Sequence, residues 1–220
     1  ILTDHESVTW QEAREKLNAG LAVLVREGSA SRNLTDIISG VIKSKIDTRR
    51  LAFCTDDKHL SDICREGTII HNILMSKGLG LDVRDAIQMA TINAAQIYGL
   101  KSLGAIAAGY VADIVILEDL ESLNIHSVYK DGKLSVNHGH IENWPESSYS
   151  TQNSKIFDSV HLPELSEKTF GLPTLDTYPV IEMIPGQIVT SQSVVAASEV
   201  SDAISCGNLR KIAVVERHNA

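Results

Sequence analysis

Two short apolar runs are the clearest structural signals along this chain. Residues 21–25 read Leu-Ala-Val-Leu-Val, and residues 51–54 read Leu-Ala-Phe-Cys. Apolar runs of this length without alternation are typical of strands that are buried on both faces in a parallel sheet. Apolar residues at helical spacing precede each run, over residues 10–17 and 34–42. The order helix, strand, helix, strand predicts an α/β fold.

Polar residues stand where each predicted strand ends. Arg26, Glu27 and Ser29 follow the first run, and Asp56 and Asp57 follow the second. The carboxyl ends of parallel strands meet at one edge of a sheet, where α/β folds bind ligands. A second interpretation stays open for the two aspartates, because Asp is also a preferred helix N-cap.

Two further helical segments are predicted downstream. Apolar positions recur at helical spacing from Leu60 to Gly78, which predicts helical structure there. Asp82 is placed to cap a second helix, whose apolar face runs from Val83 to Ala94. Near the start of the chain, Thr9 and Glu12 have the spacing of a capping box.

The pattern changes to strands after the helices. Residues 105–106 and 111–117 are predicted as strands, and residues 128–134 as a hairpin, because an Asp-Gly pair suits a tight turn with positive φ. Residues 137–155 are rich in Ser, Asn and Glu and predict a linker. A second strand-rich segment follows it.

Composition excludes several classes of function. The net charge of the 220 residues is −8 and the basic residues are scattered, which argues against a nucleic-acid groove. The three cysteines are far apart and favour a reducing compartment, so we expect a cytoplasmic protein. No apolar run is long enough to span a bilayer, so we expect no membrane partner. There is also no C-x-x-C pair and no glycine-rich phosphate loop.

Five segments resemble the adenine deaminases, a branch of the amidohydrolase superfamily. Two of them, over residues 90–100 and 104–117, are shared widely by amidohydrolases, whereas TDHE and REGSASRN are narrower and point to the adenine branch. The five segments are TDHE (3–6), LVREGSASRNL (24–34), FCTDD (53–57), ATINAAQIYGL (90–100) and GAIAAGYVADIVIL (104–117). Residues 184–190 also resemble the C-terminal domain of that family.

The resemblance implies an α/β fold made of the late strands and helices of a metal-dependent (β/α)8 barrel. It assigns residues 1–103 to the barrel, 104–136 to a small β-sandwich element, 137–155 to a linker and 156–220 to part of a strand-rich C-terminal α+β domain. The early barrel strands of the family, with their His-x-His pair, are not among the 220 residues. We therefore expect a fragment whose barrel is completed by the remainder of the polypeptide or by another chain.

The activity implied by the resemblance is the hydrolysis of adenine to hypoxanthine and ammonia, in purine salvage. A divalent transition metal is implied with it, Mn or alternatively Fe or Zn, in a two-metal site completed by residues absent from this chain. The implied partners are a purine base and further copies in a homo-oligomer. Two alternatives stay open: another amidohydrolase that cuts a cyclic amide or an N-acetyl group, and a barrel relative without catalysis.

Asp56 is the strongest candidate site residue. The resemblance gives it the position of the aspartate that ends the eighth barrel strand, which binds metal and transfers protons. His5 matches a metal-binding histidine after the sixth strand, and imidazole suits Mn, Fe or Zn. Without the resemblance, a histidine near a helix start is typical of the protein surface.

Three further residues are candidates for binding the base. Glu27, Ser29 and Asp57 are predicted at the same edge of the sheet, which we call the rim, and could form hydrogen bonds with the nitrogen edge of a purine. Glu27 could instead pair with Arg26 or Arg32. The His138-Gly139-His140 segment mimics a His-x-His metal pair, but it follows the predicted barrel, so we expect it to be solvated.

Overall fold

The computed structural model describes residues 2–142, 159–162 and 164–217. The chain divides into two units. The first comprises Ile1–Trp144 and Ile184–Val189, and it contains a parallel sheet with its helices and an antiparallel sheet. The second comprises Pro145–Met183 and Thr190–Ala220.

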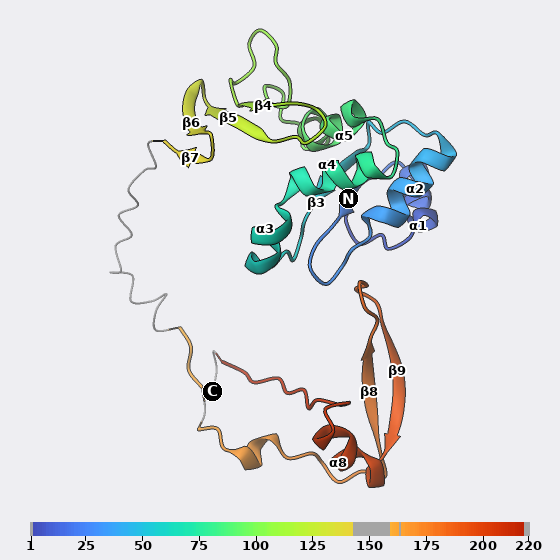
Figure 1. The fold of residues 1–220 in the computed structure, drawn as a ribbon. Coiled ribbons are helices and arrows are strands. Elements are labelled where there is room, and N and C mark those ends of the chain that lie inside the picture. Colours follow the sequence, from blue (N-terminus) through green and yellow to red (C-terminus); the bar gives the residue numbers. More distant parts are fainter. Residues whose placement is uncertain (1, 143–158, 163, 218–220) are drawn as a thin grey trace. The chain divides into compact units, whose positions relative to one another are not determined.

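A three-stranded parallel sheet is the centre of the first unit (Figure 1). Its strands are β1 (Thr3–Asp4), β2 (Ala22–Arg26) and β3 (Leu51–Cys54), in the order β1-β2-β3. Both strand pairs are parallel, with Thr3 opposite Ala22 in the first and Val23 opposite Leu51 in the second. The prediction of an α/β fold with buried parallel strands is confirmed.

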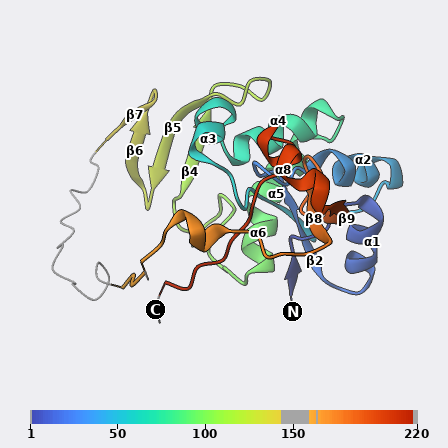
Figure 2. The same ribbon diagram turned by 90° about the horizontal axis from the view of Figure 1, so that it is seen from below.

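Helices α1 (Trp10–Asn18) and α2 (Leu34–Ser44) connect the three strands in turn. They lie side by side in both views (Figures 1 and 2). Thr9 caps α1 as predicted, because its Oγ1 accepts a hydrogen bond from the Glu12 backbone N–H at 3.3 Å. The Glu12 carboxylate accepts from the Val8 backbone N–H, at 3.0 Å, so the second arm of the capping box reaches one residue further back than predicted.

The helical structure predicted from Leu60 to Gly78 is confirmed, with one break. The segment forms two helices, α3 (Leu60–Glu66) and α4 (Ile69–Gly78). Gly67 separates them with φ +82° and ψ −163°, a conformation that side-chain-bearing residues essentially do not adopt. Apolar spacing does not register this break because it resumes in phase on the far side.

The predicted helix after Asp82 is also divided. Asp82 caps α5 (Val83–Ala90) by accepting from the Arg84 backbone N–H at 2.9 Å, as predicted. Thr91 then leaves helical geometry, with φ −130° and ψ −93°, before α6 (Ile92–Ile97) begins. The Thr91 hydroxyl donates to the Ile87 carbonyl at 2.7 Å, which satisfies that carbonyl at the break.

A four-stranded antiparallel sheet follows the helices (Figure 1). Its strands, in sheet order, are β4 (Ile114–Leu117), β5 (Ile125–Lys130), β6 (Lys133–Asn137) and β7 (His140–Ile141). The hairpin prediction is confirmed, because Asp131 and Gly132 turn between β5 and β6 with φ of 50° and 73°.

Two details of this region differ from the sequence pattern. The strand predicted at residues 105–106 is wrong, and the next strand starts at Ile114 rather than Val111. Between α6 and β4, a backbone hydrogen bond closes a loop instead: the Val111 N–H donates to the Ser102 carbonyl at 2.9 Å. Residues 137–142 complete β6 and form β7, and residues 143–155 of the predicted linker lie outside the described residues.

The core of the first unit fills the space between the parallel sheet and its helices. Leu123, between β4 and β5, joins it. The buried members of this core are Ala13, Val23, Val25, Leu34, Ile37, Ile38, Val41, Leu51, Phe53, Ile73, Leu81, Ala86, Met89 and Leu123.

The second unit is built on a hairpin. Strands β8 (Thr177–Met183) and β9 (Thr190–Ala196) pair antiparallel, preceded by the 3-10 helix η1 (Glu167–Phe170) and followed by α8 (Ala197–Ser205). The predicted strand-rich character of this segment is confirmed, while the exact domain boundaries stay predictions. Within the described part of the chain, no helix has the length and apolar character needed to cross a membrane.

Candidate active site

The three parallel strands bring polar residues from distant parts of the chain to one edge. β1 is followed by His5 and Glu6, β2 ends on Arg26 and continues into Glu27, and β3 leads to Asp56. Because the strands are parallel and in register, their carboxyl ends lie at the same edge. This is the edge at which the sequence predicts a site.

Asp56 has an unusual backbone and a half-exposed carboxylate. Its φ is +52°, in the left-handed region, and its side chain is 41% exposed. Its Oδ2 accepts a hydrogen bond from Arg26 Nη1 at 3.2 Å. The capping interpretation of Asp56 receives no support, because α3 has His59 as its N-cap residue and no side-chain cap. Asp is one of the residues that adopt the left-handed region most readily, so position 56 does not require glycine.

Arg26 connects the strands on either side of it. Its side chain is only 1% exposed, and Nη1 donates to Glu6 Oε2 at 2.9 Å as well as to Asp56. Its Nη2 donates to Asn33 Oδ1 at 3.2 Å, and the Asn33 amide in turn donates to Gln187 Oε1, also in the first unit, at 3.1 Å. The guanidinium therefore organises the carboxylates of two strand ends.

His5 joins the same group through its neighbour. His5 Nε2 lies 3.2 Å from Glu6 Oε1, and both side chains are about half exposed. The row His5, Glu6, Arg26, Asp56 therefore runs across the carboxyl ends of all three strands.

Glu27 points into the protein. It is 2% exposed, and its Oε1 lies 3.3 Å from Arg32 Nη1, so its ionic partner is Arg32 and not Arg26. Its Oε2 is buried without a hydrogen-bond partner among the described residues. Burial raises the pKa of the Glu27 carboxyl, against the opposing effect of the backbone and Arg32 contacts.

Ser29 and Asp57 hold the loop after β2 in place. The Ser29 hydroxyl bonds to the Asp62 carboxylate and accepts from the His59 backbone N–H at 2.8 Å. Asp57 Oδ2 accepts from the Ala30 backbone N–H at 3.3 Å. Both side chains therefore join this loop to the start of α3 and shape the rim.

Ion pairs to Glu66 join α3 to the loop after β2. Arg32 holds the Glu66 carboxylate with two bonds, of 3.1 and 3.2 Å, and Lys58 Nζ lies 3.0 Å from the same carboxylate. The bonds from Arg32, followed by the bond from Lys58, lower the pKa of Glu66 to about 2. These ion pairs attach α3 to the loop that carries Glu27.

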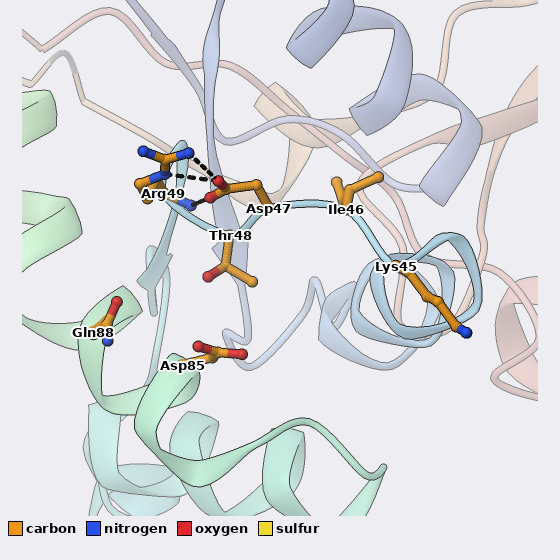
Figure 3. Close-up of a pocket in the computed structure, with 7 residues that line it drawn as sticks. All are labelled: Lys45, Ile46, Asp47, Thr48, Arg49, Asp85 and Gln88. Carbon is orange, nitrogen blue, oxygen red and sulfur yellow. Dashed lines mark hydrogen bonds and ion pairs between the residues drawn. The ribbon is translucent and has the colours of Figure 1, made fainter.

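A separate pocket, of about 440 Å³, lies at the other end of β3 (Figure 3). The residues that line it are Lys45, Ile46, Asp47, Thr48, Arg49, Asp85 and Gln88. Because residues 45–49 precede β3, this pocket is at the amino end of the strand, away from Asp56. In α/β barrels that end contributes to stability rather than chemistry.

Comparison with known proteins identifies the family. A family model described as the amidohydrolase family matches residues 7–135, which is more than half of the chain. The chain belongs to the amidohydrolase family.

Several bacterial adenine deaminases are similar to nearly the whole of this amidohydrolase chain. The protein of Desulfitobacterium hafniense (strain Y51) is 42% identical over 221 residues, which cover 99% of this chain and 38% of that protein. The protein of Geobacillus kaustophilus (strain HTA426) is 38% identical over 224 residues, with the same coverage of 99% and 38%. The chain thus spans well under half the length of these relatives.

A solved structure is similar in fold. The β-aspartyl dipeptidase of Fervidobacterium islandicum AW-1, in complex with a β-Asp-Leu dipeptide, matches with a TM-score of 0.52 at 18% identity. The match covers 66% of this chain and 41% of the dipeptidase. At this identity the likeness concerns the fold alone.

The residues of this amidohydrolase chain fit a metal ion only as part of a ligand set. His5 offers an imidazole nitrogen and Asp56 a carboxylate, and both are half exposed at the same edge. Among the described residues, no three His, Cys, Asp or Glu side chains converge on one point. The exposed His138 lies in the turn between β6 and β7, and the exposed His140 begins β7. The rings of His138 and His126 pack edge to face, with centroids 4.2 Å apart. The remaining ligands would have to come from outside the described residues.

Sequence reasoning missed Arg26 and Glu6 as members of the site. Their signal was present, because a charged residue that ends an apolar strand between two acid-bearing strands must find partners. The sequence alone did not indicate which acids those partners are.

Proposed function

We propose that this chain is the later part of an adenine deaminase, which hydrolyses adenine to hypoxanthine and ammonia. The observation that carries the proposal is the 42% identity to a curated adenine deaminase over 99% of the chain. Because the chain covers only 38% of that relative, the activity would belong to a whole protein in which these residues supply three barrel strands.

The reaction demands a nucleophile and a proton carrier. Water attacks the ring carbon that bears the amino group, a proton reaches the ring and the leaving nitrogen, and ammonia departs. Amidohydrolases are generally metal-dependent. We propose Mn, with Fe or Zn as alternatives, in a two-metal site held by His5, Asp56 and residues outside this chain, where it would lower the pKa of water.

Asp56 is our proposed proton carrier. Its Oδ2 is held by Arg26 and its carboxylate is half exposed at the strand ends, where a substrate could reach it. The carboxylate would take a proton from the attacking water and return it to the departing amino nitrogen.

Glu27, Ser29 and Asp57 are our proposed contacts to the purine. The Oε2 atom of Glu27 has no hydrogen-bond partner among the described residues, so it could accept a hydrogen bond from an N–H group of the base. Ser29 and Asp57 already hold the loop that forms the rim, so they would act on the base partly by shaping that loop.

We also propose a cytoplasmic setting for the protein. All three cysteines are free thiols, which suits a reducing cytoplasm. We further propose a role in purine salvage and assembly as a homo-oligomer, both from the relationship to adenine deaminases.

A screen for ammonia release tests the proposal. The whole protein, loaded with Mn, is offered adenine, adenosine, guanine and cytosine, and hydrolysis of an N-acetyl sugar and a cyclic amide is followed in parallel. We expect ammonia and hypoxanthine from adenine in equal amounts. Turnover of an amide substrate without turnover of adenine would replace this function with that of another amidohydrolase.

A further inference from the structure

Arg26 occupies a position where burial of its charge costs free energy unless other groups compensate it. It is the last residue of β2, the middle strand of the parallel sheet, and its side chain is 1% exposed. Guanidinium stays charged in proteins, and a buried charge must be compensated by partners. The identity of those partners therefore indicates what the arginine does.

The partners of Arg26 are the candidate site residues on both neighbouring strands. A single nitrogen, Nη1, donates to Glu6 Oε2 on the β1 side and to Asp56 Oδ2 on the β3 side, at 2.9 and 3.2 Å. Its Nη2 is occupied by Asn33 Oδ1, which fixes the plane of the guanidinium. Rotation of the fork would break all three contacts at once.

The carboxylates of Glu6 and Asp56 each accept a hydrogen bond from Arg26 through one oxygen, and the second oxygen does not contact Arg26. Glu6 turns its Oε1 toward His5 Nε2, at 3.2 Å. Asp56 Oδ1 has no hydrogen-bond partner among the described residues. The arrangement leaves an imidazole and a carboxylate oxygen available at the same edge.

We propose that Arg26 is a positioning residue for the deamination. It fixes the Asp56 carboxylate directly and the His5 imidazole through Glu6, so that one guanidinium sets the relative placement of both proposed metal ligands. This inference rests on the proposed function. A lysine could not replace the arginine, because a flexible ammonium lacks the planar fork that reaches Glu6, Asp56 and Asn33 together.

The test uses Arg26→Ala and Arg26→Lys in the whole protein. For Arg26→Ala we expect kcat to fall about 100-fold with little change in KM, because misplacement of reacting groups affects the transition state more than binding. Metal bound per folded protein should fall as well. Added millimolar guanidinium should enter the vacated space and restore kcat by about tenfold.

Two controls separate positioning from general damage. Met89→Ala removes a fully buried core side chain on α5, so it should lower thermal stability while leaving metal content and kcat at wild-type values. Arg84→Ala removes an exposed arginine paired with Asp82, and guanidinium should not change its activity.

Arg26→Lys covers the case in which the alanine variant does not fold. It keeps the charge and most of the volume, and we expect it to fold with reduced kcat and reduced metal content. Wild-type kcat and metal content in Arg26→Lys would overturn the inference. So would a loss in Arg26→Ala that matches its loss of folded protein and does not respond to guanidinium. Failure of the wild-type protein to deaminate adenine is a different outcome, and it would reject the proposed function. The metal content of the variants would then still test whether Arg26 positions the proposed metal ligands.

Discussion

Asp57 lies against Gly28 so closely that no other residue fits at position 28. A Cβ added to Gly28 would lie 2.2 Å from Asp57 Oδ1 and 2.7 Å from the carbonyl oxygen of Thr55. The second contact is with backbone, which cannot rotate away. The loop after β2 and the loop after β3 therefore meet at this glycine.

Gly28→Ala should separate these two loops. We expect a loss of about 1–3 kcal/mol in the free energy of unfolding, as for other overpacked sites, and a fall in kcat because Asp56 is next to Asp57. Thermal or urea unfolding and steady-state kinetics of the whole protein measure both. Gly78→Ala is the matched control, because an added Cβ there meets nothing within 4 Å. Equal behaviour of the two variants would contradict the close approach.

Glu66 should contribute a pH-dependent part of the stability. Arg32 and Lys58 lower its pKa from 4.5 to about 2 in the folded protein. A carboxyl with a lowered folded-state pKa stabilises the fold above its unfolded pKa, and this is lost as the pH falls from about 4.5 toward about 2.

Glu66→Gln should therefore lower the melting temperature near neutral pH, and the difference from wild type should narrow below pH 4.5. Melting curves across this pH range measure it. Glu15→Gln, on the exposed face of α1, is the control and should run parallel to wild type. A difference that stays constant through the acid range would show that Glu66 acts without its charge.

Glu27→Gln should have opposite effects on stability and binding. Burial raises the pKa of Glu27, so its ionised form costs free energy in the fold as the pH rises above the unfolded pKa. Replacing it with a neutral amide should leave the melting temperature at neutral pH unchanged or higher. The KM for adenine should rise roughly tenfold if the Glu27 carboxyl forms a hydrogen bond with the base. An unchanged KM would remove Glu27 from the base site.

Much of the fold follows from the chain's apolar pattern. Runs such as 21–25 and 51–54 predict buried strands, which the structure contains, and the Asp131-Gly132 pair specifies its turn locally. The breaks at Gly67 and Thr91 could not be predicted, because they depend on single backbone conformations within segments whose apolar spacing continues. The local backbone conformation sets the two breaks, and hydrophobic periodicity does not detect that conformation.

The grouping of the candidate residues at one edge could be predicted from the sequence, but their hydrogen bonds could not. Strand ends placed His5, Glu27 and Asp56 at one edge, as their order in the sequence requires. The choice of Arg32 over Arg26 as the partner of Glu27 depends on which side of β2 each side chain leaves, and only the three-dimensional structure gives that.

The isolated segment should fold poorly. Within the described residues, β1 and β3 are the outer strands of the parallel sheet, and each has one edge without a partner strand. Open edges of this kind promote aggregation. Residues 1–220 expressed alone should be insoluble, and co-expression with the preceding barrel strands of an adenine deaminase should increase the soluble fraction. A cooperative melt of the segment alone would contradict this prediction.

Asp56→Asn in the whole protein is the most direct test of the proposed chemistry. Asn tolerates the left-handed backbone of position 56 and keeps an oxygen for Arg26, so the fold should be retained. Asp85→Asn, in the pocket at the other end of β3, makes the same chemical change away from the site. The measurement is the rate of ammonia release from adenine by the two variants at equal metal loading. We predict a loss of about a thousandfold or more for Asp56→Asn and wild-type turnover for Asp85→Asn. Retained turnover in folded, metal-loaded Asp56→Asn would contradict a proton-transfer role for this carboxylate.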